Sequence, residues 1–436
     1  ARLCLLFPVS DPVPRVDAIA TVACLTRARA NRTAIVRSLD DEEDEKCGTD
    51  VSLVKLDSTS TGAGLGRYYR PELDWLRFIA FSMVFLMHAF PQKSDRYIAL
   101  GIPRVLAEYA IVPFVQAGGY GVDLFFALSA FLITELLLRE KEATGRVHVK
   151  SFYLRRILRI WPLYITFILL VFPYEVFTKH FPIMYYISML AFTGNWYIVV
   201  TGGFPSLCGN LWSVCIEEQF YIVWPNLVGR VKTARFAAIL FGIFIFTCLY
   251  RILYVYGPPP LPYVVWYNTF TRLDGFALGG LLACALHGRP IVLPLAIRSL
   301  TFLVALAIFW TLGNFPIGGY FGVYPAWTYP LAAVSSVLFI FAFVASPSRT
   351  TLSPPLRLLS YLGKISFGLY VFHGPALRLL ERQFGQQWPA PEWAWVYRMA
   401  LAAAITLIAS MISYAALERP FLRMKRRFTF VASRPE

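Results

Sequence analysis

From residue 71 onward, long apolar runs alternate with short polar loops along the chain. Most of these runs have the length that an α-helix needs to cross a membrane, which is about 20 residues. Because a backbone in lipid must satisfy its own hydrogen bonds, runs of this length predict helices. The sequence therefore predicts an all-α fold, a polytopic bundle of transmembrane helices. The candidate segments are 73–90, 119–138, 155–173, 183–200, 211–228, 235–256, 268–286, 292–313, 326–345, 357–380 and 395–417.

The N-terminal part of the chain has a different composition. Residues 1–70 include the acidic run DDEEDEKCGTD and the turn-rich run STSTGAGLGR. A segment this polar buries too little apolar surface to fold alone, so we expect a disordered or weakly ordered cytoplasmic tail. Residues 71–425 are expected to form the transmembrane domain, and residues 426–436 a cytoplasmic C-terminal tail.

The charge of the loops indicates how the helices cross the membrane. The loops 139–154 and 229–235 are rich in Lys and Arg, which is typical of cytoplasmic loops. An even number of crossings must separate two loops on one side, but three apolar runs lie between these two. We expect that 183–200 does not cross, because Gly194–Asn195 interrupts it and Pro182 precedes it.

This assignment leaves about ten spanning helices, with both termini on the cytoplasmic side of the cell membrane. The loops 257–267 and 314–325 contain no Lys or Arg, which supports this topology. Three basic residues in the first predicted external loop, Lys93, Arg96 and Arg104, oppose it. The protein is accordingly expected to be an integral, multi-pass membrane protein.

Composition supports this class and limits the possible partners. The chain is 57% hydrophobic and 15% charged, which favours a lipid bilayer as its surroundings. The net charge of +15 could indicate nucleic-acid binding, but the basic residues lie in short loops without interleaved aromatic residues. The seven cysteines lack the spacings of metal sites. We therefore expect no nucleic acid, no metal and no bound cofactor.

The first apolar run, LDWLRFIAFSMVFLMHAF, contains Asp74, Arg77 and His88. Arg77 and His88 are eleven residues apart, which places them within about 20° of one helix face and about 16 Å apart along the axis. Ionisable groups at this depth usually face a protein cavity, because exposure to hydrocarbon is costly. The alternative is that Arg77 reaches a lipid headgroup and that His88 is a hydrogen-bonded histidine within the bundle.

The third run begins with SFYLRRILRIWPLY, which contains three arginines. Arg155, Arg156 and Arg159 lie within one helical turn, so they can converge on one face. Such a group can bind the phosphates of an anionic ligand. The alternative is an anchor at the cytoplasmic surface of the membrane.

The fifth run, NLWSVCIEEQFYIVWP, contains two adjacent carboxylates, Glu217 and Glu218. Two neighbouring residues cannot both face lipid without cost, so at least one must meet a polar partner. Ser213 shares a helix face with Glu217. A salt bridge to one of the arginines is the structural alternative to a catalytic role.

Other polar residues lie inside the apolar runs. Asp123 opens the second run, where a carboxylate can simply favour the positive end of the helix dipole. Arg272 and Asp274 open the seventh run, and His373 lies inside the tenth. We interpret the Arg272–Asp274 pair and His373 as structural.

Taken together, these segments resemble the acyltransferase 3 family of integral membrane acyltransferases over roughly residues 71–425. Arg77 and His88 match the family's opening motif, and Arg156 and Arg159 match its RxxR pair. Ala130 departs from the family, which usually has Gly there. The further matching segments, in chain order, are YGVDLFFALSAFLIT, FYLRRILRIWPLY, LWSVCIEEQFYIVWP, LGKISFGLYVFHGPAL and LERPF.

The resemblance implies transfer of an acyl group, often acetyl, from a cytoplasmic acyl-CoA to an acceptor hydroxyl. The acceptor would be a carbohydrate, a lipid-linked glycan or another hydroxyl compound. His88 would be the general base, with Arg77 and Glu217 in the same catalytic group. The expected donor-binding residues are Arg155, Arg156 and Arg159. The expected supporting residues are Asp123, Ser213 and His373.

Two other classes remain open. A secondary transporter would also bury Arg, His and Glu, although transporters often show paired interrupted helices and this chain has one such segment, 183–200. A membrane scaffold without activity is the third class. Release of CoA from acetyl-CoA by the purified protein would distinguish an enzyme from both.

Overall fold

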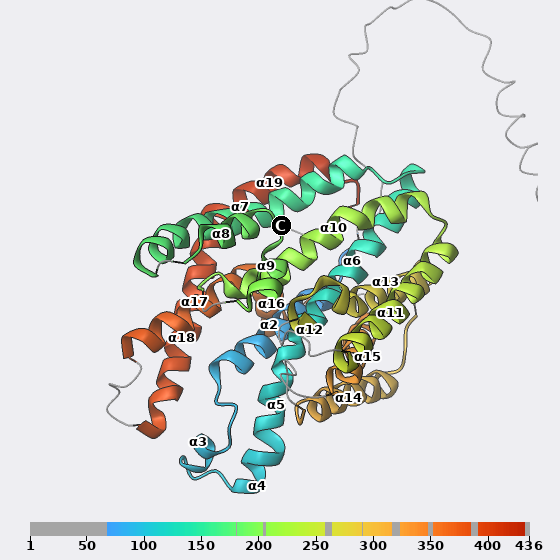
Figure 1. Cartoon of the computed structure of the whole chain (residues 1–436). Helices are drawn as coiled ribbons and strands as arrows, with labels where there is room; N and C mark the ends of the chain where they lie inside the picture. Colours follow the sequence, from blue (N-terminus) through green and yellow to red (C-terminus); the bar gives the residue numbers. More distant parts are fainter. Residues whose placement is uncertain are drawn as a thin grey trace, which may run out of the picture. The chain divides into compact units, whose positions relative to one another are not determined.

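The computed structural model describes residues 68–179, 181–203, 206–257, 264–289, 291–315, 323–347, 352–384 and 391–431. All regular secondary structure in these ranges is helical, which confirms the all-α fold (Figure 1). The expected N-terminal tail lies outside the described residues, apart from its last three.

The helices follow the predicted apolar runs closely. The first group is α2 (Pro71–Ala89), α3 (Asp95–Ile98), α4 (Arg104–Leu106), η1 (Ala107–Ile111), α5 (Val112–Ala117), η2 (Gly118–Tyr120), α6 (Gly121–Thr144) and α7 (Val149–Lys179). The second is α8 (Ile183–Leu190), α9 (Gly194–Thr201), η3 (Gly209–Leu211), α10 (Trp212–Arg230), α11 (Thr233–Tyr256), α12 (Val264–Tyr267), η4 (Thr269–Thr271) and α13 (Leu273–Leu286). The third is α14 (Leu295–Leu312), α15 (Pro325–Val344), α16 (Pro354–Lys364), α17 (Ser366–Phe384), α18 (Pro391–Ser413), η5 (Tyr414–Glu418), α19 (Arg419–Lys425) and η6 (Arg426–Phe428).

Six helical stretches in the described residues are long and apolar enough to cross a membrane. The predicted count of about ten therefore stays a prediction, because α2, α10 and α17 carry several polar groups and α13 is only 14 residues long. The six stretches are Arg104–Thr144, Val149–Lys179, Thr233–Tyr256, Leu295–Leu312, Pro325–Val344 and Trp395–Phe428.

Helix α2 is in contact with α6, α15, α16 and α17 and so connects several parts of the bundle. It begins with Pro71, whose fixed φ suits a first helical turn, and Asp74 lies at the positive end of the helix dipole. It ends at Ala89, just before Phe90 and Pro91, because the residue before a proline disfavours helix.

Glycines allow α2 and the segment before α6 to approach closely. A Cβ on Gly118 would lie 2.2 Å from the carbonyl oxygen of Met83, and one on Gly121 would lie 2.5 Å from that of Ala80. Any larger residue would therefore push the two helices apart.

The segment 183–200 does not form a spanning helix. It consists of α8 and α9, each eight residues long, so each reaches only about 12 Å across a core of about 30 Å. The break contains Phe192, whose φ of 55° is left-handed. This agrees with the prediction that the segment does not cross.

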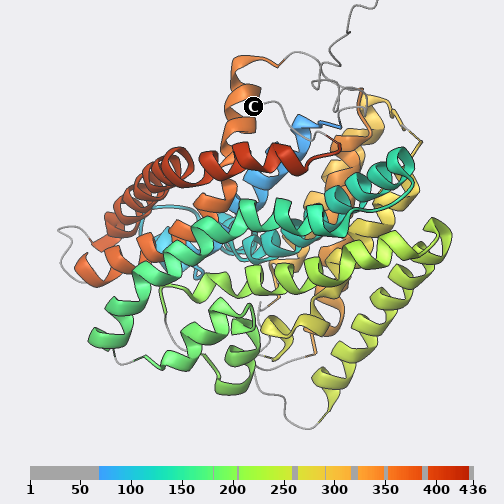
Figure 2. The same ribbon diagram turned by 90° about the horizontal axis from the view of Figure 1, so that it is seen from above.

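The two basic loops on either side of this segment touch each other. Lys141, near the end of α6, donates hydrogen bonds of 2.9 Å to the carbonyl oxygens of Val228 and Val231. The loop after α6 and the loop after α10 therefore lie on the same face of the bundle, as the charge pattern predicts. Figure 2 shows that α7 and α19 run side by side, and the C-terminal helices contact the first part of α7.

Two predicted segments differ from the structure. The run 357–380 is not one helix: it is divided between α16 and α17, with the break at Ile365. Helix α16 carries polar residues on one side, including exposed Arg357, which suits a surface helix rather than a crossing. The region before 119 is helical from Arg104, whereas we expected a loop there.

Candidate functional site

Two cavities lie along α2, near its two ends. The arginine pocket includes Arg77, from the first turns of α2, and the histidine cavity includes His88, from its last turn. The eleven-residue spacing of these two side chains corresponds to about 16 Å along the axis. Helix α2 therefore contributes Asp74 and Arg77 to one cavity and His88 to the other.

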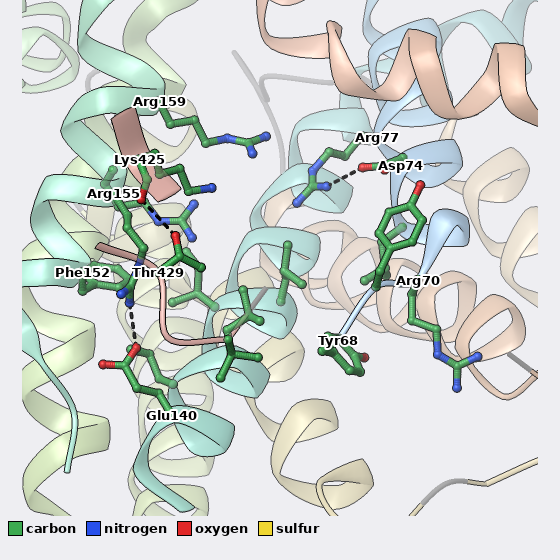
Figure 3. Close-up of a pocket in the computed structure, with 18 residues that line it drawn as sticks. Tyr68, Arg70, Asp74, Arg77, Glu140, Phe152, Arg155, Arg159, Lys425 and Thr429 are labelled. Carbon is green, nitrogen blue, oxygen red and sulfur yellow. Dashed lines mark hydrogen bonds and ion pairs between the residues drawn. The ribbon is translucent and has the colours of Figure 1, made fainter. Parts of the chain in front are cut away.

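The arginine pocket is lined by positively charged side chains from three separate parts of the chain. Figure 3 shows that side chains from α2 and from α7 point toward one another across this space. The pocket contains all three arginines of the α7 cluster, so their predicted convergence on one site is confirmed. Its six cationic side chains, which outnumber its two carboxylates, are those of Arg70, Arg77, Arg155, Arg156, Arg159 and Lys425.

Arg155 is held by the protein itself. Its guanidinium lies 2.8 Å from a carboxylate oxygen of Glu140 and donates to the carbonyl oxygen of Phe428 at 2.7 Å. Glu140 also accepts the backbone N–H of His148 at 2.8 Å. Arg155 therefore joins α6, α7 and the C-terminal segment, which is a structural role.

Arg156 has a different environment. Its guanidinium lies over the rings of Phe152 and Tyr221, at 5.4 Å from each centroid. Its Nε is buried and has no hydrogen-bond partner among the described residues. A buried donor without a partner is costly, so this group is available to a ligand. Arg77 pairs with Asp74 at 3.0 Å on its own helix.

The arginine pocket is closed in this conformation. It has about 40 Å³ of space that water can occupy, which is too little for a nucleotide. Its surplus of positive charge favours an anion with several phosphate groups. Binding such a ligand requires the long side chains that line the pocket to move apart.

The histidine cavity is much larger, at about 640 Å³. His88 is exposed to this space although it lies inside an apolar helix. His373, from α17, lies beside it with a distance of 5.3 Å between the ring centroids. The aromatic residues Trp212, Trp266 and Tyr267 form another part of the lining. The cavity therefore combines two imidazoles with an aromatic wall.

Hydrogen bonds determine which nitrogen of each imidazole carries the proton. Nδ1 of His88 lies 2.8 Å from the carbonyl oxygen of Val84, and Nδ1 of His373 lies 2.7 Å from that of Tyr370. Since a carbonyl oxygen only accepts, each Nδ1 must carry the hydrogen. Nε2 is then the unprotonated nitrogen of each neutral ring. Nε2 of His373 is buried without a partner among the described residues.

Glu217 lies in a polar group inside the bundle. It accepts a hydrogen bond of 2.7 Å from Ser129, and Tyr221 donates to the same serine at 3.4 Å. Glu218 accepts instead from Trp161 at 3.2 Å. Each carboxylate therefore accepts a hydrogen bond from a neutral donor. The sequence predicted such a polar partner for at least one of the two. Arg156 and Arg77 both act electrostatically on Glu217, which connects it to the arginine pocket.

Ser213 supports the wall of the histidine cavity. Its hydroxyl lies 2.7 Å from that of Tyr370, which also donates to the carbonyl oxygen of Asn210 at 3.0 Å. Asn210 in turn donates to the backbone of Tyr370 at 2.5 Å. These bonds join α10 to α17 beside His373.

Asp123 forms a fully buried ion pair with Arg272 at 3.1 Å. Arg272 also lies over Trp266 and Trp212, at 5.3 and 5.8 Å from their rings. The pair therefore supports the aromatic wall of the cavity from behind. Arg272 and Asp274, interpreted from the sequence as structural, each form a buried ion pair with another partner, because Asp274 pairs with Arg251 at 2.7 Å.

The sequence did not identify several residues of the two cavities. Asn210 and Arg378 line the histidine cavity, and Lys425 lines the arginine pocket. Arg378 lies five residues after His373, at the end of an apolar run, where an arginine usually indicates a membrane anchor. Ser129 hydrogen-bonds Glu217, which is 88 residues away in sequence.

Comparison with known proteins gives an independent assignment. A family model described as an acyltransferase domain matches residues 70–415. The peptidoglycan O-acetyltransferase OatA of Listeria monocytogenes (serovar 1/2a, strain EGD-e) is 28% identical over 352 residues, which cover 75% of this chain and 55% of that protein. A Staphylococcus aureus (strain MSSA476) relative is 28% identical over 382 residues, covering 81% of this chain and 57% of the relative.

The Bacillus subtilis (strain 168) protein YrhL is 27% identical over 367 residues, which cover 76% of this chain and 55% of YrhL. The chain thus spans somewhat more than half the length of these relatives. No solved structure is significantly similar to the chain.

Proposed function

Because the chain belongs to the acyltransferase 3 family, we propose that it transfers an acetyl group from acetyl-CoA to a hydroxyl group of a carbohydrate. The observation that carries this proposal is the hydrogen bonding of the His88 imidazole. Its Nδ1 is committed to the carbonyl oxygen of Val84, so its Nε2 is free to accept a proton. The side chain also faces a cavity large enough for a sugar.

The chemistry follows from this geometry. The acceptor oxygen forms a bond to the acetyl carbonyl carbon, and its proton passes to Nε2 of His88. The carbon–sulfur bond then breaks, and its electron pair leaves on the sulfur of CoA. His88 returns the proton to this thiolate, so CoA leaves as the thiol. A positioned general base typically contributes 10²–10⁴-fold to such a step, because a neutral hydroxyl is a poor nucleophile.

The arginine pocket is the proposed site for the phosphates of CoA. Arg156 has a donor there without a partner among the described residues, and Arg77 and Arg159 line the same pocket. An extended pantetheine arm would follow α2 from this pocket to the thioester position beside His88. Glu217 and Ser129 would position Tyr221 by hydrogen bonds and, through its ring, Arg156.

The acceptor is proposed to bind in the histidine cavity. Trp212, Trp266 and Tyr267 provide apolar ring faces, which suit the flat face of a sugar ring. A relative of this chain is named a peptidoglycan O-acetyltransferase, which supports a sugar-containing acceptor. His373, whose Nε2 has no partner in the described part of the chain, would accept a hydrogen bond from a second hydroxyl of the acceptor.

The orientation in the membrane is part of the proposal. The arginine pocket lies beside the basic loops, with the loops after α6 and α10 in contact. By the positive-inside rule this face would be cytoplasmic, where acetyl-CoA is available. The histidine cavity would then lie nearer the external side, and both termini of the domain would be inside. The family match argues against the alternative of a secondary transporter.

The test uses the full chain, purified in detergent, with acetyl-CoA and a panel of oligosaccharides. We expect acceptor-dependent release of free CoA thiol and an acetylated product by mass spectrometry. His88→Ala should lower turnover by about 10²–10⁴-fold, or about 3–5 kcal/mol in the barrier, with donor binding retained. Glu217→Gln should also lose turnover, though less completely.

His287→Ala is the matched control, since His287 lies outside both cavities. It should retain turnover within a few-fold. If His88→Ala also retains turnover within a few-fold while folded, His88 is a packed core residue and the mechanism is wrong. If no acceptor in the panel releases CoA from acetyl-CoA, the proposed activity is wrong.

A further inference from the structure

One face of α17 lines the histidine cavity along about three turns. The lining residues of this helix recur at positions 370, 373, 374, 377, 378 and 381, which is the spacing of a single helix face. His373 lies on this face, and Arg378 lies just over one turn further on. Arg382, one residue beyond the face, does not line the cavity and is exposed.

Arg378 brings a permanent positive charge to the cavity. Among the described residues that line this space, it is the one Lys or Arg side chain. Its Nη1 is buried and has no hydrogen-bond partner in the described part of the chain. It also acts electrostatically on His88, so the charge lies near the reacting group.

The local structure leaves room for this guanidinium. A Cβ on Gly209 would lie 3.2 Å from one terminal nitrogen of Arg378 and 3.4 Å from the other. The absence of a side chain at Gly209 therefore allows the guanidinium to lie against the backbone of η3. The arginine is held at the cavity wall rather than extended toward a membrane surface.

Two further atoms of the same wall lack partners. The amide nitrogen of Asn210 donates to the carbonyl oxygen of Tyr370, so its Oδ1 is left as an acceptor, and this atom is buried and unpartnered among the described residues. Nε2 of fully buried His373 is the second such acceptor. Buried polar groups are nearly always hydrogen-bonded, so these atoms are acceptors available to a ligand in the cavity.

We propose that this wall is an acidic-sugar subsite, in which Arg378 binds a carboxylate or phosphate of the acceptor while Asn210 and His373 accept hydrogen bonds from its hydroxyls. The inference rests on the proposed acetyl transfer for its biological meaning, but not for the binding itself. A guanidinium matches the geometry of both anionic groups. Glu381 is on the same face but forms no ion pair with Arg378 among the described residues, so the guanidinium is not neutralised there.

The experiment measures binding to the full chain in detergent, without acetyl-CoA. The probes are glucose, glucuronic acid and glucose 6-phosphate, which share one ring and differ in charge. Binding is followed by equilibrium dialysis with radiolabelled sugar. We expect the wild-type protein to bind at least one acidic probe about tenfold more tightly than glucose, because a charge-assisted hydrogen bond is worth about one decade or more in affinity.

Four variants assign the preference to the proposed residue. Arg378→Gln should bind acidic and neutral probes equally, and Arg378→Lys should keep part of the preference. Gly209→Ala should reduce the preference by crowding the guanidinium, which tests the same contact without removing the arginine. Arg382→Gln, the matched control on α17, should behave like the wild type. Thermal denaturation establishes that each variant is folded.

The outcomes separate this inference from the proposed function. A preference for the carboxylate or for the phosphate probe identifies the group that is bound, and either supports the subsite. Equal binding of all three probes by the wild type, no binding of either acidic probe, or an unchanged preference in folded Arg378→Gln overturns it. If the protein transfers acetyl groups but does not prefer acidic probes, the proposed function is supported and the subsite is not. If it prefers acidic probes but transfers no acetyl group, only the subsite is supported.

Discussion

Arg155 and Arg156 are adjacent on α7, but their replacement should have different consequences. Arg155→Ala removes the ion-pair partner of Glu140, and the two side chains are only 11% and 3% exposed. An uncompensated buried charge costs about 3–5 kcal/mol. Glu140 keeps the N–H of His148 at 2.8 Å, so we expect the lower end, about 3 kcal/mol.

Arg156→Ala should affect the donor instead. Arg156 forms no ion pair among the described residues, and its Nε has no partner there to lose. Its contacts with the rings of Phe152 and Tyr221 are worth about 0.5–1 kcal/mol each. A lost phosphate contact of about 1.5–3 kcal/mol should raise the KM for acetyl-CoA by roughly ten- to a hundredfold.

The assay compares thermal denaturation and donor saturation for the two alanine variants in the same detergent. We expect Arg155→Ala to melt several degrees lower than the wild type, and Arg156→Ala to melt close to it with weakened donor saturation. Arg156→Lys should recover part of the donor affinity, since lysine keeps the charge but not the planar fork. Unchanged donor saturation in folded Arg156→Ala would refute the phosphate-binding role and leave this arginine as a membrane anchor.

Two further predictions concern stability. Asp123→Asn should destabilise the protein by about 3–5 kcal/mol, since it leaves Arg272 as an unpaired buried cation, and adding Arg272→Met should restore much of this in thermal denaturation; full stability of the single variant would contradict this account. The hydrogen bond to Glu135 raises the pKa of His287 above 6.5, so its stabilisation is complete below about pH 6.5 and is lost as the pH rises through the raised pKa. His287→Asn should flatten this part of the pH–stability curve, and an unchanged curve would exclude His287 as its source.

The spacing of residues along the sequence was sufficient to predict the parts of the site that lie on one helix. The positions of Arg77 and His88 follow from helix periodicity, and the convergence of the α7 arginines follows from their placement within one turn. The interruption of 183–200 was visible because Gly194–Asn195 and Pro182 are strong local signals. These features depend on residues close together in the chain.

Features that depend on distant segments could not be predicted. The partner of Asp123 is on α13, 149 residues away, and that of Glu217 is on α6, 88 residues away. No periodicity relates such positions, because helix packing alone brings them together. The same holds for Arg378. Its sequence position suggests a membrane anchor, and only its contact with the distant Gly209 identifies it as a cavity residue.

The bond between His88 and the backbone of its own helix has a consequence for the energetics of the membrane. Since Nδ1 is held by Val84, Nε2 is the single nitrogen that can take up and release a proton. In the proposed mechanism this nitrogen passes the hydrogen of the acceptor to the thiolate of CoA, so a hydrogen moves from acceptor to donor while the acetyl group moves the opposite way. The exchange consumes no free proton and carries no net charge across the membrane. Turnover should therefore proceed equally well in energised cells and in de-energised vesicles.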